Sequence, residues 1–127
     1  MLKATYDSRF FVEFFYSKNE TVHRKLKEEK KCKEKYVSAI VIHEVFKLSL
    51  NREGRDVARF RATLMKKDFK VIPVDDQIAQ ISAELRQKYD LSMGDSMIAA
   101  TAAILKAACV SDDPHFKQIK EIETTWI

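Results

Sequence analysis

The sequence GDSMIAATAAILKAACVSDDPHF, residues 94–116, contains the pattern that decides the fold. The part from Ser96 to Ala108 is rich in alanine and nearly uncharged, which is typical of a helix packed in the centre of a protein. Residues 108–110 then predict a short buried strand, which stops at the polar turn before Pro114. A helix that leads into a buried strand is the repeating unit of a parallel sheet. This stretch therefore predicts an α/β fold.

Strand and helix patterns also alternate along the rest of the chain. Because crossovers between parallel strands are right-handed and need helices, such alternation predicts helices on both faces of the sheet. We therefore expect one domain over residues 1–127, a three-layer α/β/α sandwich with a mainly parallel central sheet of four to five strands. Strands are predicted at residues 2–6, from Tyr36, at 69–74 and at 122–127, and helices at 9–16 (opened by Asp7 and Ser8), 19–35, 39–50, 54–67 and 75–89.

Apolar side chains at helical spacing predict the core. In the helix over residues 54–67, Phe60 and Leu64 are expected to be buried. The helix over residues 19–35 has few apolar positions among many charges, so it is expected to be largely exposed. The first helix is expected to bury a phenylalanine stripe of Phe10, Phe11, Phe14 and Phe15.

The composition is that of a globular protein with a strongly ionised surface. Of 127 residues, 46% are hydrophobic and 33% charged, with a net charge of +4. A positive net charge of this size is compatible with RNA binding, but it is also common in proteins that bind no RNA. Cys32 and Cys109 lack disulfide or zinc spacing, which favours the cytoplasm. The sequence has no secretory signal and no membrane-span pattern, so we expect neither export nor membrane insertion. Its only glycines are Gly54 and Gly94, which are too few for a P-loop.

Asp7, Glu44, Asp95 and Asp113 are acidic residues that end or interrupt apolar stretches. Asp7 and Asp113 follow predicted strands, and ligands of open parallel sheets bind beyond the carboxyl ends of the strands. A lone buried carboxylate is costly unless a counter-charge is found. Several carboxylates together favour a hard divalent cation such as Mg²⁺ or Mn²⁺. The sequence thus indicates a metal site for phosphoryl chemistry.

Each acid also has a purely structural explanation. Asp7 and Asp95 could cap the helices that follow them. Glu44 could form an ion pair with Lys47, and Asp113 could be an ordinary turn residue. The functional interpretation depends on all four acids lying together.

The motifs around these acids resemble those of the PIN-domain family, metal-dependent ribonucleases that include the VapC toxins of toxin–antitoxin pairs. The family's first acid, followed by Ser or Thr, resembles Asp7-Ser8, and its helix-borne Glu after a Ser-Ala start resembles Glu44 after Ser38-Ala39. The most specific match is Asp-Ser-Met-Ile-Ala-Ala-Thr-Ala, residues 95–102. The resemblance covers nearly the whole chain.

The fourth motif carries the departures from the family pattern. Residues 111–116, Ser-Asp-Asp-Pro-His-Phe, resemble Thr-Asn-Asp-x-Asp-Phe, which aligns the fourth acid with Asp113. Asp112 then replaces a frequent Asn and His115 replaces a frequent Asp, while the first strand is less apolar than typical. His115 is a candidate proton donor or outer ligand, with an ordinary surface histidine as the alternative.

The resemblance implies an endoribonuclease that uses Mg²⁺ or Mn²⁺. Asp7, Asp95 and Asp113 would hold the metal, and Glu44 would share ligation or activate the water. It further implies a homodimer and, for a toxin, a VapB-like antitoxin. The expected supporting residues are Ser8, Ser111 and Asp112, and the candidates for RNA contact, or else plain surface charges, are Arg9, Arg52 and Arg55.

Other functions remain open. The chain could be a non-catalytic PIN-like module that binds RNA or protein, or a housekeeping RNA-processing nuclease. A phosphoacceptor signalling domain also has an acidic Mg²⁺ pocket, but it needs paired acids after the first strand, where this chain has Ser8-Arg9 after Asp7.

Overall fold

The computed structural model describes residues 3–29 and 34–127. In this part of the chain, five strands form one sheet in the order β3-β2-β1-β4-β5, and every neighbouring pair is parallel. The predicted parallel sheet is therefore confirmed. Its strands are β1 (Lys3–Tyr6), β2 (Glu34–Ser38), β3 (Lys70–Ile72), β4 (Ala108–Val110) and β5 (Thr124–Thr125).

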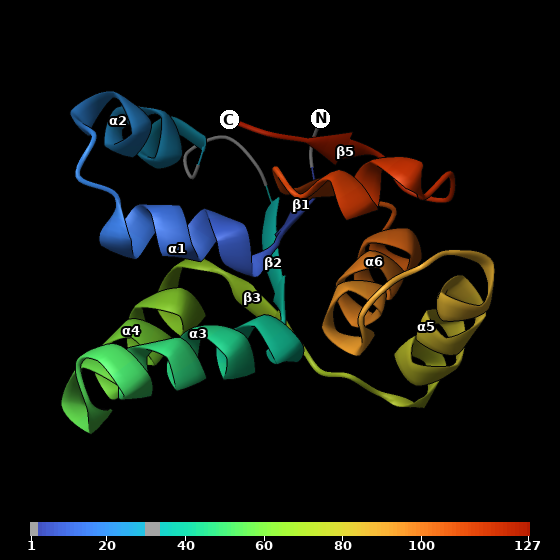
Figure 1. Ribbon diagram of the computed structural model, residues 1–127, viewed down its shortest axis with the longest axis horizontal. Helices are drawn as coiled ribbons and strands as arrows, with labels where there is room; N and C mark the ends of the chain where they lie inside the picture. Colours follow the sequence, from blue (N-terminus) through green and yellow to red (C-terminus); the bar gives the residue numbers. More distant parts are fainter. Residues whose placement is uncertain (1–2, 30–33) are drawn as a thin grey trace.

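Helices cover both faces of the sheet, which confirms the three-layer α/β/α sandwich (Figure 1). β1, β2 and β3 lie side by side in chain order, so right-handed crossovers place α1–α4 on one face. The return from β3 to β4 places α5 and α6 on the other face. The helices are α1 (Ser8–Tyr16), α2 (Glu20–Glu29), α3 (Ala39–Arg52), α4 (Arg55–Asp68), α5 (Asp76–Lys88), α6 (Met93–Leu105) and the 3-10 helix η1 (Pro114–Gln118).

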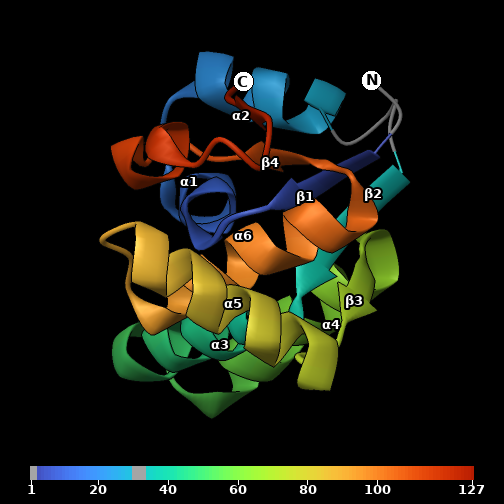
Figure 2. The ribbon, with the colours of Figure 1, turned by 90° about the vertical axis from the view of Figure 1, so that its right-hand side faces the viewer.

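Helix α6 is the central helix that its alanine-rich sequence predicts. It contacts β1, β2 and β4, and α5 packs against it (Figure 2). Ile98, Ala99 and Ala100 are fully buried, because small side chains let the helix lie close to the sheet. The helix begins at Met93, three residues before the predicted start, because Ser92 caps it.

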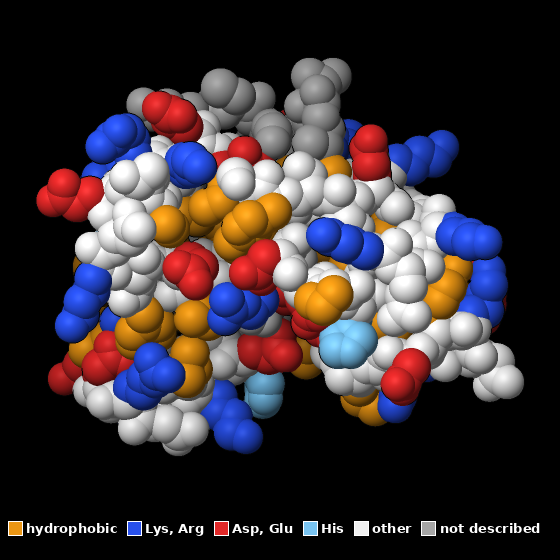
Figure 3. Space-filling model, turned by 45° about the horizontal axis from the view of Figure 1, so that its top comes forward, with side chains coloured by type: hydrophobic (Ala, Val, Ile, Leu, Met, Phe, Trp, Pro, Cys, Tyr) orange, Lys and Arg blue, Asp and Glu red, His pale blue; other side chains and the backbone are white. Residues whose placement is uncertain are grey.

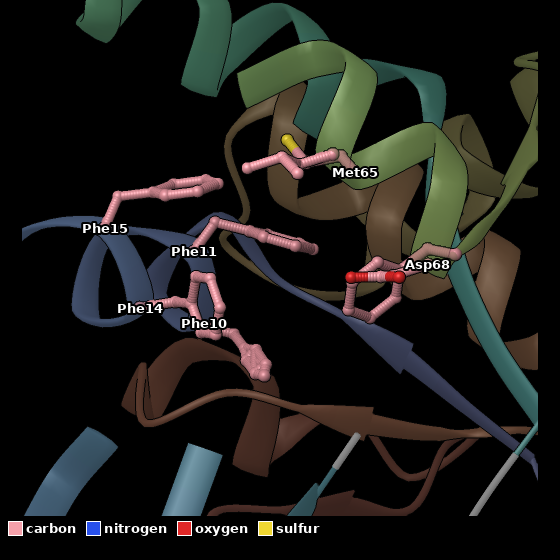
Figure 4. Close-up of a pocket in the computed structure, with 8 residues that line it drawn as sticks. Phe10, Phe11, Phe14, Phe15, Met65 and Asp68 are labelled. Carbon is pink, nitrogen blue, oxygen red and sulfur yellow. The ribbon is translucent and has the colours of Figure 1, made fainter. Parts of the chain in front are cut away.

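An aromatic cluster holds α1 on the sheet. The ring centroid of Tyr6 on β1 lies 4.7 Å from that of Phe10 and 5.1 Å from that of Phe69, which precedes β3. The ring of Phe11 lies 5.0 Å from Phe69. Farther along α1, Phe11 and Phe15 extend toward Met65 of α4 across a small apolar pocket (Figure 4). The predicted phenylalanine stripe therefore packs inward, although its outer members are only half-buried.

Three predicted details were wrong. Glu34 and Lys35, placed in a helix, belong to β2, where they pair with β1. The last strand is only two residues long. Phe60 is 63% exposed, because α4 turns Ala58, Arg61 and Met65 inward instead.

Arg61 explains why α4 has this orientation. Its guanidinium lies 4.6 Å from the centre of the Tyr16 ring and 5.0 Å from that of Phe15. It also donates to Ser49 Oγ and forms an ion pair with Glu53. A half-buried arginine with these partners replaces the expected apolar side chain and ties α1, α3 and α4 together. None of the described helices is long and apolar enough to cross a membrane.

We expect Phe10→Ala to lower the free energy of unfolding by about 3–5 kcal/mol, because it empties a site in the aromatic cluster. Phe60→Ala is the matched control, since it removes an exposed ring and should cost less than about 0.5 kcal/mol. Urea unfolding followed by circular dichroism measures both values. Equal losses in the two variants would contradict the orientation of α4.

Candidate functional site

Asp7 and Ser111 lie side by side at the carboxyl ends of β1 and β4. Tyr6 pairs with Val110 in the ladder, and Asp7 N donates to Val110 O at 3.1 Å. The chain builds the sheet outward from β1 in one direction and then returns to add β4 on the other side of β1. The two strands therefore flank the topological switch point, where open α/β sheets bind their ligands.

Asp7 is held by neutral hydrogen-bond donors. Its side chain is nearly buried, with the residue 3% exposed. Its Oδ1 accepts from Ser8 N at 2.7 Å, as the N-cap of α1, and its Oδ2 accepts from Ser111 Oγ at 2.6 Å. Ser111 Oγ in turn accepts from Asp113 N at 3.0 Å. Ser111 thus links the first acid to the turn that carries the fourth.

Glu44 reaches the same place from α3. Ser8 Oγ donates to Glu44 Oε1 at 2.5 Å. A Cβ atom on Gly94 would lie 2.9 Å from Glu44 Oε2, so the absent side chain of Gly94 gives the carboxylate its room. Among the described residues no ion pair joins Glu44 to Lys47, so the alternative explanation by such a pair is not supported.

Asp95 and Asp113 approach each other from α6 and from the turn after β4. One ligand atom each of Asp95, Asp113 and His115 lie within 4.8 Å of one another. Asp113 Oδ1 accepts from His115 N at 2.9 Å and contacts the ring Nδ1 at 2.8 Å. We call Asp7, Glu44, Asp95 and Asp113 the carboxylate cluster.

The four carboxylates repel one another through space. Burial, with repulsion from Asp95 and Asp113, raises the pKa of Asp7 to about 6 although its hydrogen bonds oppose the change. Burial and repulsion from Asp113 and Glu44 raise the pKa of Asp95. Burial and repulsion from Asp7 raise the pKa of Glu44. No described lysine or arginine forms an ion pair with the cluster, so a cation would relieve the repulsion.

The donor set suits a hard divalent ion. Carboxylate oxygens are the ligands that Mg²⁺ and Mn²⁺ prefer, and the cluster offers oxygens from four side chains. Figure 3 shows acidic side chains near the middle of one face of the molecule, with histidine and basic side chains close by. Such a site could hold a metal ion that binds a phosphate group and activates water.

Of the three arginines expected to contact RNA, Arg9 lies next to the cluster, whereas Arg52 and Arg55 do not. Arg9 pairs with Asp112 at 3.1 Å and with Glu13 at 3.5 Å, so Asp112 balances an arginine next to the cluster. Arg52 lies two helical turns beyond Glu44, about 12 Å along α3, and its guanidinium covers the Tyr16 ring. Arg55 is exposed at the start of α4, and among the described residues it forms no ion pair with the acids.

Sequence reasoning missed two features of the site. It offered Asp95 as a possible N-cap and did not identify Ser92, whose Oγ accepts from Asp95 N at 3.1 Å, so that Asp95 lies inside the first turn. The close approach of Gly94 to Glu44 was also missed. The signal for the first was a serine three residues before Asp95, which is the spacing of a capping serine. A single sequence carries no signal for the second.

The chain matches the family model described as PIN domain over residues 5–122. Among curated proteins, no sequence matches it significantly.

Solved structures show the same fold. VapBC2 from Rickettsia felis, bound to a DNA fragment from its promoter, has 16% identity and a TM-score of 0.83, covering 100% of this chain and 99% of that chain. DNA-bound VapBC from Salmonella typhimurium has 17% identity and a TM-score of 0.81, covering 99% and 98%. VapC20 from Mycobacterium tuberculosis, described as a sarcin–ricin-loop-cleaving toxin, has 17% identity and a TM-score of 0.74, covering 91% and 93%.

The raised pKa of Asp7 predicts how stability depends on pH without divalent ions. Between the ordinary value of 3.8 and about 6, the folded protein binds more protons than the unfolded chain, so stability falls as pH rises through this window. Asp7→Asn removes the contribution of Asp7 to this slope. Between pH 4 and pH 7.5 the metal-free variant should therefore lose less stability than the wild type, by up to roughly 3 kcal/mol.

Urea unfolding in EDTA at both pH values measures the effect. Asp112→Asn is the control, because Asp112 is half-exposed and paired with Arg9, and it should leave the pH slope unchanged. The same slope in Asp7→Asn as in the wild type would show that Asp7 is not the group responsible.

Proposed function

The chain belongs to the PIN-domain family, and on this premise we propose that it is a divalent-metal-dependent endoribonuclease, the toxin of a VapBC-type toxin–antitoxin pair. The observation that carries the proposal is the convergence of Asp7, Glu44, Asp95 and Asp113, which come from four separate segments, at the switch point of the sheet. Family membership supports nuclease chemistry, and the uncompensated carboxylates support a metal. Residues 1–127 form the nuclease domain, and we expect it to act in the cytoplasm.

In this proposal Asp7, Asp95 and Asp113 hold Mg²⁺ or Mn²⁺, and Glu44 shares ligation or accepts the proton of the attacking water. An ion held there would lower the pKa of water and would neutralise charge on the phosphate oxygens. Ser8 Oγ orients Glu44 by its hydrogen bond, and Ser111 orients Asp7. The water oxygen forms the new bond to phosphorus as the bond to the ribose oxygen breaks. No side-chain nucleophile is required.

Substrate attraction needs positive charge near the cluster. Arg9 is the best-placed arginine, because its partner Asp112 is adjacent to Asp113. RNA phosphates would compete with Asp112 for its guanidinium, whereas Arg52 and Arg55 lie farther along the surface of α3 and α4. The net charge of +4 favours encounter with RNA generally.

The toxin assignment is a proposal that rests on likeness of fold. The structural relatives include VapBC assemblies, so a VapB-like antitoxin that covers the carboxylate cluster is the partner we expect. A short gene directly upstream, whose product binds this chain and blocks cleavage, would separate a toxin from a housekeeping nuclease. If the chain binds RNA without cleaving it, a non-catalytic module is the better description.

Asp95→Asn should abolish cleavage, because it removes a metal ligand and leaves the start of α6 intact. Purified protein is incubated with labelled RNA and Mn²⁺ or Mg²⁺, and we expect a rate loss of at least about a hundredfold, equal to the loss in EDTA. Asp76→Asn is the matched control, an exposed aspartate in the first turn of α5. Cleavage by Asp95→Asn at the wild-type rate would refute the proposed site.

Gly94→Ala tests the role of Glu44 without changing an acid. Alanine suits a helix better than glycine by up to about 1 kcal/mol, so thermal stability should hold or rise. The added methyl group displaces the Glu44 carboxylate, so cleavage should fall by roughly tenfold or more. Gly54→Ala cannot serve as the control, because Gly54 has a φ of 94° and an alanine there would strain the backbone. Unchanged cleavage in a stable Gly94→Ala protein would exclude Glu44 from the reaction.

We also propose a homodimer formed through α3. Ile42, Phe46 and Leu50 repeat every four residues on its outer face, and Leu50 is 41% exposed. A two-fold axis across this stripe would pair each residue of one copy with the stripe of the other. Phe46→Arg should give monomers in light scattering, while Phe60→Arg on α4 should not. Dissociation by Phe60→Arg alone would place the interface elsewhere.

A further inference from the structure

His115 is fixed beside the carboxylate cluster by its own backbone. It lies in the first turn of η1, whose N-cap is Asp113. The cap hydrogen bond from His115 N and the contact of ring Nδ1 both involve Asp113 Oδ1, at 2.9 and 2.8 Å. The side chain is 58% exposed, and within the described residues the hydrogen bonds of His115 are all with Asp113. Packing therefore does not explain the position of this ring.

The spacing of the donor atoms matches a coordination shell. With metal–ligand distances of about 2.1 Å, neighbouring donors of an octahedral site lie about 3 Å apart and opposite donors about 4.2 Å apart. The contact of 2.8 Å between His115 Nδ1 and Asp113 Oδ1 is close to the neighbouring distance. All three donors of Asp95, Asp113 and His115 lie within 4.8 Å, so small side-chain movements would complete the set.

We propose that the imidazole of His115 is a direct ligand of the divalent ion held by Asp95 and Asp113, and that it makes the site prefer Mn²⁺ to Mg²⁺. This inference rests on the proposed function, because it requires the carboxylate cluster to bind a divalent ion. Imidazole nitrogen binds first-row transition ions well, whereas Mg²⁺ prefers oxygen donors and keeps its waters. Adding one nitrogen to a site of carboxylate oxygens therefore raises the affinity for Mn²⁺ more than the affinity for Mg²⁺.

A histidine that only orients Asp113 is the competing explanation. In that role the ring would donate to the carboxylate and remain outside the first coordination shell. Its loss would then weaken both ions alike, and no nitrogen would be bonded to the metal. Direct ligation instead predicts a metal–nitrogen bond and a loss confined mainly to Mn²⁺. The two roles thus differ in measurable ways that do not depend on cleavage.

The test measures metal binding by the full chain after removal of metals with EDTA. Pulsed electron paramagnetic resonance of bound Mn²⁺ should show coupling to a directly bonded nitrogen, which disappears in His115→Ala. Calorimetric titration should show that His115→Ala loses roughly tenfold in Mn²⁺ affinity and less than about twofold in Mg²⁺ affinity. In His115→Asp both ions should bind, with the preference for Mn²⁺ reduced and no nitrogen coupling.

His43→Ala is the matched control, because His43 is another exposed histidine and directly precedes Glu44. It should keep the nitrogen coupling and the Mn²⁺ affinity. If Mn²⁺ binds without nitrogen coupling, or the coupling is lost only in His43→Ala, the role of His115 is refuted while the nuclease proposal stands. If neither ion binds the wild-type chain, the metal-dependent function itself fails.

Discussion

Repulsion among the carboxylates is the constraint on which the site depends. Asp7, Glu44 and Asp95 have raised pKa values because the fold buries them and holds them near other negative charges. Their partners are hydroxyl and backbone N–H groups, which orient a carboxylate without cancelling its charge. A lysine or arginine paired with the cluster would cancel its negative charge and would also occupy the place of a metal. The neutral partners keep the negative charge available to an ion.

Packing elsewhere has to resist this repulsion. The aromatic contacts of Tyr6, Phe10 and Phe69 hold the start of α1, and so Asp7 and Ser8, against the sheet. Arg61 joins α1 to α3 through Tyr16 and Ser49, which keeps Ser8 within reach of Glu44. α6 brings Asp95 to the same place because its small side chains allow close packing. The contacts that hold the acids in place are thus made by neighbouring core residues and not by the acids themselves.

The α/β class, the layers and the four acids could be predicted, because each depends on local patterns. Asp7 and Asp113 follow buried strands, and the alanine-rich α6 has a composition that suits only a buried helix. The orientation of α4 could not be predicted, since the burial of Arg61 depends on rings from α1 that are far away in sequence. The strand assignment of Glu34 and Lys35 failed for a similar reason. Their charges continue a helical pattern, and only pairing with β1 makes them extended.

The start of α6 shows how the choice of capping residue affects the surroundings of an acid. An N-cap aspartate uses its carboxylate to accept backbone N–H groups, as Asp7 does from Ser8. In α6 Ser92 takes that role, and no described backbone N–H donates to the Asp95 carboxylate. Asp95 is therefore placed in the first turn, where the helix dipole favours a negative charge. With Ser92 as the cap, Gly94 and Asp95 both lie in the first turn of α6, where Gly94 faces the Glu44 carboxylate.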